Sequence, residues 1–461
     1  MTTPTLKHLT VKPLLALLVT LAACSTTEIL DVQDPDIINP GAVNSPAGAA
    51  ALYAGAVGEF GFSVVGDRGA TEGQILVSGS FTDELINSET FPTRLEYELR
   101  QIDVRNGTLT TIFRNLQRAR VLLEATVPAL KQYSPSPANR IGEAYALAGY
   151  TYVFFGENYC SGVPFSAAFP TTVYGMPLTT TEIFTVAIAR FDSAMAYLTA
   201  TDTATVTRRY LALVGKARAL LNRRAAGDDS AAAAAADNVP VTFVYNTTHS
   251  LSSNRQNNGV WAFTAQFKRF SVADVEGTNG LNFRTAGDRR VLSQRTFTVS
   301  GTDTVRNLGF DNITPQWDPL KYPAATSVTP ISNGVEAKLI HAERLMVSNP
   351  TAWLDTLNYL RDTTKFTIAQ GGVRGLAPLT DPGTPAARVD IMFRERAFWM
   401  YLTGHRLGDL RRLMRQYGRT EDVVFPTGLG LKGFYGHDLN LPVPFDEQNN
   451  PNFTGCLDRN P

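Results

Sequence analysis

The sequence has few of the residue patterns that carry catalysis or bind metals. It contains five histidines in 461 residues, and none stands in an H-E-x-x-H motif or at the spacing of a metal-binding pair. A G-x-S-x-G nucleophile motif, a Walker phosphate loop and a dinucleotide-binding glycine motif are also missing. We therefore predict no metal, no cofactor and no catalytic residues. A glycoside hydrolase stays open as an alternative, because its two carboxylates can lie far apart in sequence.

The chain also lacks an excess of charge of either sign. Lysine plus arginine and aspartate plus glutamate each number 42, so the formal net charge is zero. Nucleic-acid binding needs a clustered positive excess, and nucleic acid is therefore not an expected partner. After the first 24 residues no apolar run of about 18 residues remains to suggest a membrane-spanning helix.

The N-terminus has the features of a bacterial lipoprotein signal. Two lysines precede the apolar run 14–23, which is too short for a permanent membrane span. The run ends in Leu-Ala-Ala-Cys, the pattern that signal peptidase II cleaves before a lipidated cysteine. We predict a signal peptide over 1–23, lipidation at Cys24 and an extended tether over 24–44. Because Ser25 and not aspartate follows the cysteine, the prediction favours the outer membrane, where several acyl chains make anchoring permanent.

Only three cysteines are present, and lipid would consume the first. The remaining pair, Cys160 and Cys456, would lie in an oxidising compartment after export. An even pair there predicts one disulfide that joins the C-terminal tail to the end of a mid-chain helix. Two unrelated buried thiols are the alternative.

Most of the mature chain shows the periodicity of amphipathic helices that come in pairs. Apolar residues recur every three or four positions, and alanine or glycine stands where a neighbouring helix would cross. Such pairs are what tetratricopeptide-type stacks need, although the strict repeat consensus is absent. We predict a mainly α domain over 45–461. Its expected helices cover 45–57, 109–123, 139–157, 180–198, 206–222, 231–236, 335–347 and 352–361.

Residues 239–333 differ in character, being rich in Asn, Ser, Thr, Gly and aromatic residues. This stretch is too polar for a core and too long for a connector, so we predict an insertion of loops and short hairpins. Exposed aromatic rings can stack on sugars or hold peptide side chains. Trp261, Trp317 and Tyr245 of the insertion, with Phe91 from an expected loop at 81–102, are the predicted ligand contacts. The alternative is that most of these rings fix the insertion to the helices.

A long helix is expected over 391–412. Its apolar residues, from Phe393 to Leu407, fall on one face, and the opposite face carries arginines and Glu395. On spacing alone, such charges predict a solvated face with ion pairs between successive turns.

The same stretch, with the order E-R…G-H-R…D-L-x-R, resembles the C-terminal signature of SusD/RagB-type surface lipoproteins. Three further segments resemble the family: L-D-V-x-x-P-D at 30–36, the E-A-x-L-I-x-A-E element at 336–343 and the L-P-V-P segment near 441–444. The resemblance implies a SusD-like helical stack. It also implies a protein at the cell surface that binds an oligosaccharide or peptide without chemistry and delivers it to a SusC-like, TonB-dependent outer-membrane transporter. A helical surface scaffold of other purpose is the second hypothesis, and a surface glycoside hydrolase the third.

Overall fold

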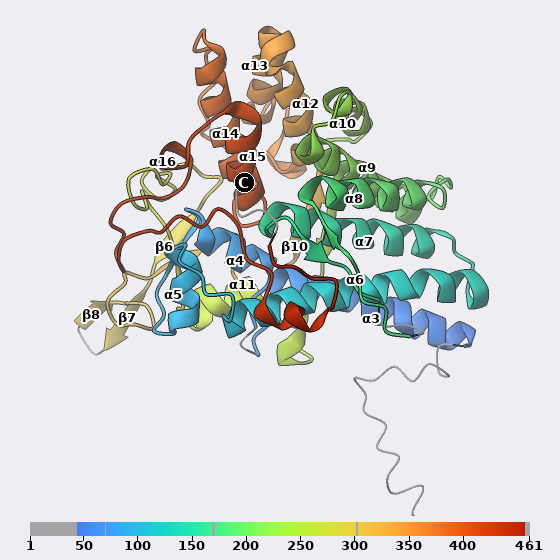
Figure 1. The fold of residues 1–461 in the computed structure, drawn as a ribbon. Helices are drawn as coiled ribbons and strands as arrows, with labels where there is room; N and C mark the ends of the chain where they lie inside the picture. Colours follow the sequence, from blue (N-terminus) through green and yellow to red (C-terminus); the bar gives the residue numbers. More distant parts are fainter. Residues whose placement is uncertain (1–43, 70, 168–170, 301–302, 457–461) are drawn as a thin grey trace, which may run out of the picture.

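Long amphipathic helices pack in layers and form the larger part of the molecule (Figure 1). The computed structural model describes residues 44–456 except 70, 168–170 and 301–302. The predicted signal peptide, Cys24 and nearly all of the tether lie outside these residues. The layered helices follow one another in the order α3 (Pro46–Val65), α6 (Gly107–Tyr133), α7 (Asn139–Asn158), α8 (Thr180–Met195), α9 (Thr203–Arg223), α10 (Asp228–Asp237), α12 (Gly334–Ser348) and α13 (Pro350–Arg361).

Small residues let these helices approach closely, as their sequence pattern predicts. The ring of Phe191 on α8 lies between Gly149 of α7 and Gly215 of α9. A Cβ atom at Gly149 would lie 2.8 Å from that ring, and one at Gly215 would lie 2.4 Å away. The helix spacing at this point therefore depends on both glycines.

Helix α3 begins where the sequence indicates, at Ser45, whose side chain accepts a hydrogen bond from the backbone N–H of Gly48 at 3.0 Å. Among the described helices, α3 alone has the length and mean hydropathy of a membrane span, and half of its apolar window is buried inside the protein. Its buried face packs on α6. The hydropathy of α3 is therefore accounted for by its place in the core.

The insertion consists of short antiparallel strand pairs, loops and a few helical turns. Strand β4 (Val244–Thr247) pairs with β10 (Thr329–Asn333), so the two ends of the insertion lie side by side. The other strands are β5 (Phe270–Val272), β6 (Ser293–Arg295), β7 (Phe297–Ser300), β8 (Asp303–Arg306) and β9 (Trp317–Pro319); β6 pairs with β9 and β7 with β8. Short helical turns are η1 (Asn254–Gln256), α11 (Gly259–Trp261) and η2 (Ala262–Gln266).

The prediction of a loop over 81–102 is wrong. Helix α4 (Gln74–Phe81) leads into β1 (Leu85–Asn87), which pairs with β5 of the insertion, and α5 (Pro92–Glu98) follows. Most of this stretch is buried, including Asp83 and Glu84. The carboxylates that suggested a loop lie inside the protein instead. Arg406 donates to Asp83, and the backbone N–H of Leu402 donates to one oxygen of Glu84.

The long helix expected over 391–412 is two helices. Helix α14 (Pro385–Trp399) ends before a turn in which Leu402 and Gly404 both have positive φ, of 50° and 75°, and α15 (Arg406–Tyr417) begins after it. The solvated face is also wrong. Arg394 is exposed, whereas Glu395, Arg411 and Arg412 are buried.

These buried arginines form ion pairs with carboxylates from distant parts of the chain. Arg218 of α9 donates to Glu157 of α7, with its Nε atom at 2.8 Å. The other pairs are Arg396–Asp409, Arg406–Asp83, Arg412–Glu343 and Arg290–Glu395. Because the partners come from different elements, the pairs join α14 to α15 and connect both to the turn after α4, to α12 and to the insertion.

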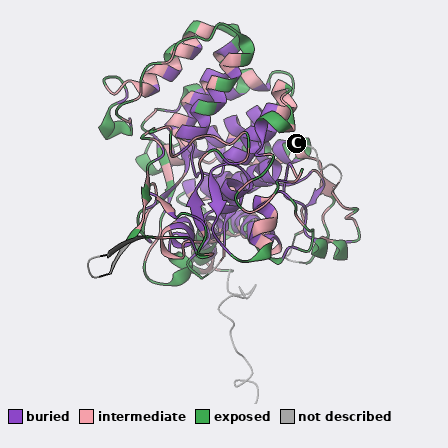
Figure 2. Cartoon of the chain, turned by 90° about the vertical axis from the view of Figure 1, so that its left-hand side faces the viewer, coloured by how far each residue is buried: buried purple, intermediate pink, exposed green. Residues whose placement is uncertain are grey.

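The C-terminal segment crosses the outside of the stack as an extended strap. Leu441 exchanges backbone hydrogen bonds of 2.8 and 2.9 Å with Asn158 and Cys160 at the end of α7. A disulfide joins Cys160 to Cys456, with Cα atoms 5.9 Å apart. Figure 2 shows the buried residues concentrated in the interior of the molecule. Short elements β2 (Val163–Pro164), β3 (Pro177–Leu178), η3 (Ile368–Gln370), α16 (Glu421–Val424) and η4 (Phe445–Asn449) complete the chain.

Candidate functional site

Three chain segments meet beside the N-terminal end of α5, at the side of the molecule where Figure 1 labels α5, β7 and β8. Backbone hydrogen bonds join them: the N–H of Ser88 donates to Arg269 at 2.9 Å, that of Phe310 to Lys268 at 2.8 Å, and that of Asp311 to Ser88 at 3.0 Å. The hydroxyl of Ser88 also donates to the carbonyl of Lys268 at 2.8 Å. The side chains that project from these segments are therefore fixed relative to one another.

Phenylalanine rings and guanidinium groups alternate on this surface, which we call the Phe91 patch (Phe91, Arg94, Phe267, Arg269 and Phe310). The guanidinium carbon of Arg269 lies 4.6 Å from the ring centroid of Phe310, 5.5 Å from that of Phe91 and 5.8 Å from that of Phe267. The guanidinium carbon of Arg94 lies 5.1 Å from the ring centroid of Phe91. These cation–π contacts stabilise the positions of the rings.

Two of the rings keep a large exposed surface beside the guanidinium groups. Phe91 is 51% exposed and Phe310 49% exposed, whereas Phe263, Phe270 and Phe283 of the insertion are buried. Phe91 and Phe310 differ from the other exposed apolar residues because both contact the same arginine, Arg269. Exposed aromatic surface gathered in this way can pack against sugar rings or other planar groups.

Carboxylates next to the patch are all engaged with its cations. Glu89 pairs with Arg269 and lies 3.4 Å from Arg94, and Glu72 pairs with Arg94. Burial raises the pKa of Glu72, although the bond from Arg94 counters it. These acids therefore fix the positions of the arginines. The surface of the patch consists of aromatic side chains and guanidinium N–H groups.

A β-turn loop at 428–435 borders the patch. Its Lys432 pairs with Asp311. Burial disfavours the charged form of Asp311, but hydrogen bonds from Lys432 and Thr314 outweigh it, so the pKa of Asp311 is below its usual value. Leu429, Leu431 and Phe434 of the same loop are exposed. Ile313, which stands two residues after Asp311, is 67% exposed.

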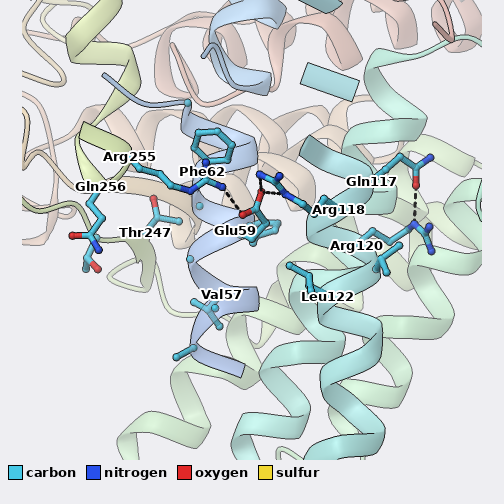
Figure 3. A pocket seen from close by; sticks show the side chains of 18 of the residues that line it. Val57, Glu59, Phe62, Gln117, Arg118, Arg120, Leu122, Thr247, Arg255 and Gln256 are labelled. Atoms are coloured by element: carbon cyan, nitrogen blue, oxygen red, sulfur yellow. Dashed lines mark hydrogen bonds and ion pairs between the residues drawn. The ribbon is translucent and has the colours of Figure 1, made fainter. Parts of the chain in front are cut away.

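A separate trough runs along α3 (Figure 3), with a volume of about 1160 Å³. Its floor is α3, one wall is α6 and the other is the segment 245–256 that includes β4 and η1. Figure 3 shows Arg118 from α6 and Arg255 from the opposite wall reaching the same carboxylate, Glu59. Arg255 also lies 3.7 Å from the ring centroid of Phe62.

The structure does not bring the four predicted ligand contacts together. Phe91 lies in the patch. Tyr245 borders the trough, is half-buried, and donates its hydroxyl proton to Glu143 of α7 at 2.6 Å. This hydrogen bond holds β4 against the helices.

The two predicted tryptophans have other neighbours. Trp261 is half-buried in α11 and packs against the core, with its backbone N–H bonded to Asn258. Trp317 lies in β9 between two guanidinium groups, 4.9 Å from Arg284 and 6.0 Å from Arg295. The residue is partly buried against the core and lies at a different place from Phe91.

Phe310 and Arg269 were missed by the sequence analysis. Phe310 follows Gly309 and precedes Asp311-Asn312, and an apolar ring in the middle of such a polar turn is a usable signal for an exposed contact. Arg269 carries no sequence signal of its own, because its position opposite Phe91 results from the pairing of β1 with β5.

No protein-family model matches this sequence, and no curated protein matches it. Solved structures do. A SusD superfamily protein from Parabacteroides distasonis is 12% identical with a TM-score of 0.66, and the match covers 89% of this chain and 98% of that one. B. fragilis NanU is 12% identical with a TM-score of 0.61, covering 93% and 100%. A SusD-like carbohydrate binding protein from Bacteroides vulgatus is 15% identical with a TM-score of 0.56, covering 80% and 83%.

These likenesses define the chain first as a helical stack with a loop-rich insertion, which confirms the predicted fold class. They then give that fold its name: the chain has the SusD/RagB fold, in a strongly divergent sequence.

Proposed function

We propose that this protein is a lipid-anchored surface protein that binds a nutrient oligosaccharide at the Phe91 patch. The observation that carries the proposal is the pair of half-exposed rings, Phe91 and Phe310, held apart by Arg269 on a hydrogen-bonded base. Rings of this kind stack on the apolar faces of sugars, while guanidinium N–H groups donate to hydroxyls. A solved protein of the same fold is described as carbohydrate binding, which supports the same ligand class.

Binding without catalysis fits the carboxylates around the patch better than hydrolysis does. A glycoside hydrolase needs two carboxyl groups facing the same glycosidic bond, about 5 to 9 Å apart. Glu72, Glu89 and Asp311 are instead each bonded to a cation of the patch or its border. A peptide ligand is the second candidate, favoured by the exposed aliphatic residues Leu429, Leu431 and Ile313 next to the rings.

The remaining parts of the proposal concern location and partner. The lipobox at Cys24 supports anchoring in the outer membrane. The SusD-like fold supports delivery of the ligand to a SusC-like, TonB-dependent barrel. A surface scaffold without a ligand is the alternative for the whole protein.

Calorimetry of the purified protein against a panel of oligosaccharides and peptides tests the proposal, with product analysis of each mixture after prolonged incubation. We expect saturable binding of at least one oligosaccharide and no change in its length. Cleavage of the bound glycan would assign the protein to the hydrolases. Lack of binding across the panel, with a folded protein, would favour the scaffold.

A further inference from the structure

The trough along α3 is open and larger than an ordinary ligand pocket. Its lining includes α3 from Ala54 to Gly66, which is about 18 Å at 1.5 Å per residue. A Cβ atom added at Gly55 or Gly58 would meet no atom within 4 Å, so space lies directly above the helix backbone. Its volume of about 1160 Å³ exceeds the range of about 300 to 1,000 Å³ that suits compact small molecules. The shape fits an extended chain lying along the helix.

Positive charge faces this space from both walls. Glu59 accepts from Arg118 at 2.7 Å and from Arg255 at 2.6 Å, so one carboxylate serves two guanidinium groups. Both arginine side chains are 50% exposed. The remaining N–H groups point to solvent or the trough and can hold further carboxylates.

Apolar side chains line part of the remaining space, beside polar residues of the wall and one further acid, Glu447. Val57 of α3 and Leu122 of α6 are labelled along it in Figure 3, and Val121 also belongs to the lining. The occupant that fits is therefore an extended segment carrying both aliphatic and acidic side chains.

We propose that residues 29–40 of this chain, ILDVQDPDIINP, bind in the trough. The segment carries Asp31, Asp34 and Asp36 among five aliphatic residues, which matches the arginines and the apolar floor. It precedes α3, the helix that forms the floor, by only a few residues. Attachment to the same helix gives it a high effective concentration at the trough.

The lengths allow this docking if about half of the segment lies in the 18 Å trough and the rest runs along the first turns of α3, before Ala54. The far end of the trough, at Gly66, lies about 30 Å from the start of α3 at Pro46. Residues 29–40 span about 36 Å when extended. Pro40-Gly41 is a turn dipeptide that lets the chain reverse before α3 begins and run back along it.

Docking would set the distance between the protein and its anchor. With lipid on Cys24, as proposed above, a free tether to Pro46 reaches up to about 70 Å from the membrane. With residues 29–40 docked, only residues 24–28 remain free, and the reach of that part falls to about 16 Å. Docking would then hold the face of the protein that carries the trough close to the membrane.

Site-specific photo-cross-linking of the full-length protein in its membrane tests the proposal. A p-benzoylphenylalanine replaces Thr248, an exposed residue of the trough wall, and a matched control carries it at exposed Ala234 on α10. After irradiation, mass spectrometry identifies the cross-linked peptides. We expect a cross-link from position 248 to residues 29–40 within a single chain, and none from position 234.

Two further variants separate docking in the trough from chance contact. Gly58→Trp fills the open floor, and Gly107→Trp makes the same change at an exposed helical glycine with equal room outside the trough. Gly58→Trp should lower the cross-link yield at least fivefold, and Gly107→Trp should leave it unchanged. Changing Asp31, Asp34 and Asp36 to Asn should also lower it, without touching the folded body.

Several results would overturn the proposal. They are absence of a cross-link to residues 29–40, a yield unaffected by Gly58→Trp, or cross-links from position 234 of similar yield. Cross-links between two chains would assign the trough to a second copy, and a cross-link to another protein would assign it to that partner. None of these outcomes bears on ligand binding at the Phe91 patch, which is measured separately.

Discussion

Arginines serve opposite purposes in the helical stack and in the Phe91 patch. In the stack, Arg218, Arg396 and Arg412 are each buried against a carboxylate. In the patch, Arg269 has a carboxylate on one side and phenylalanine rings on the other, and the rings are half exposed. The same residue type therefore joins helices in the stack and supports exposed aromatic rings in the patch. The exposure of the neighbouring rings, and not the residue type, distinguishes the two regions.

The largest effect expected from this comparison is the loss of a buried pair. Glu157→Ala leaves Arg218 buried without its main partner, since the next carboxylate, Glu336, lies 4.0 Å away. We expect the free energy of unfolding to fall by about 3 to 5 kcal/mol, measured by urea denaturation. Arg114→Ala, which breaks the exposed pair with Asp446, is the matched control and should cost less than about 1 kcal/mol. Equal losses of unfolding free energy in Glu157→Ala and Arg114→Ala would contradict the expected difference between buried and exposed ion pairs.

The strap that crosses the stack should contribute the next largest effect. Removing the Cys160–Cys456 disulfide by Cys456→Ala should lower the free energy of unfolding by about 2 to 4 kcal/mol, because the bridge closes a long loop. Reductant should destabilise the wild type by a similar amount and leave the variant unchanged. Free alkylation of both thiols in the non-reduced protein would show that the bridge is absent.

Substitutions in the Phe91 patch should lower the affinity for the ligand and leave the free energy of unfolding nearly unchanged. Phe91→Ala removes a half-exposed ring, and we expect ligand affinity to fall by about 1 to 2 kcal/mol, roughly five- to thirtyfold, measured by calorimetry. Phe445→Ala is the matched control, since Phe445 is also partly exposed and covered by an arginine, Arg105, at 4.4 Å. Weaker binding in both variants would place the ligand elsewhere.

The smallest change in stability is expected near pH 4.5 from Glu84→Gln, which replaces a buried acid without a paired cation. Burial raises the pKa of Glu84 to about 8, and its Oε2 atom has no hydrogen-bond partner. The folded state thus keeps a proton that the unfolded state releases near pH 4.5, so stability falls as pH rises from about 5 to 8. Glu84→Gln imitates the protonated acid. It should change stability at pH 4.5 by less than about 1 kcal/mol and flatten this decline at higher pH, which urea titrations across pH would reveal.

The helices were predictable from sequence because their signals are local. Periodic apolar residues and small residues at crossings located α6, α7, α8, α9, α12 and α13 to within a few residues, except that α6 extends ten residues beyond the prediction. The break at 400–405 was not predicted, because Leu402 adopts a positive φ that its side chain does not favour.

The burial of Arg411 and Arg412 and the composition of the patch depend on distant partners. The carboxylate that pairs with Arg412 comes from Glu343, and the ring beside Arg269 comes from Phe91, 178 positions away by residue number. Spacing along one helix carries no information about such partners, so the charged face of α15 was predicted to be solvated. Of the four predicted ligand contacts, only Phe91 lies in the patch.

The ion pairs of α14 and α15 have an evolutionary consequence. Asp83 and Arg406, or Glu343 and Arg412, cannot be replaced one at a time without stranding a charge in the interior. Substitutions in descendants of this chain should therefore arrive as coupled exchanges between remote positions. In an alignment of such sequences, single positions of the motif would look poorly conserved, although the ion pairs between those positions are kept.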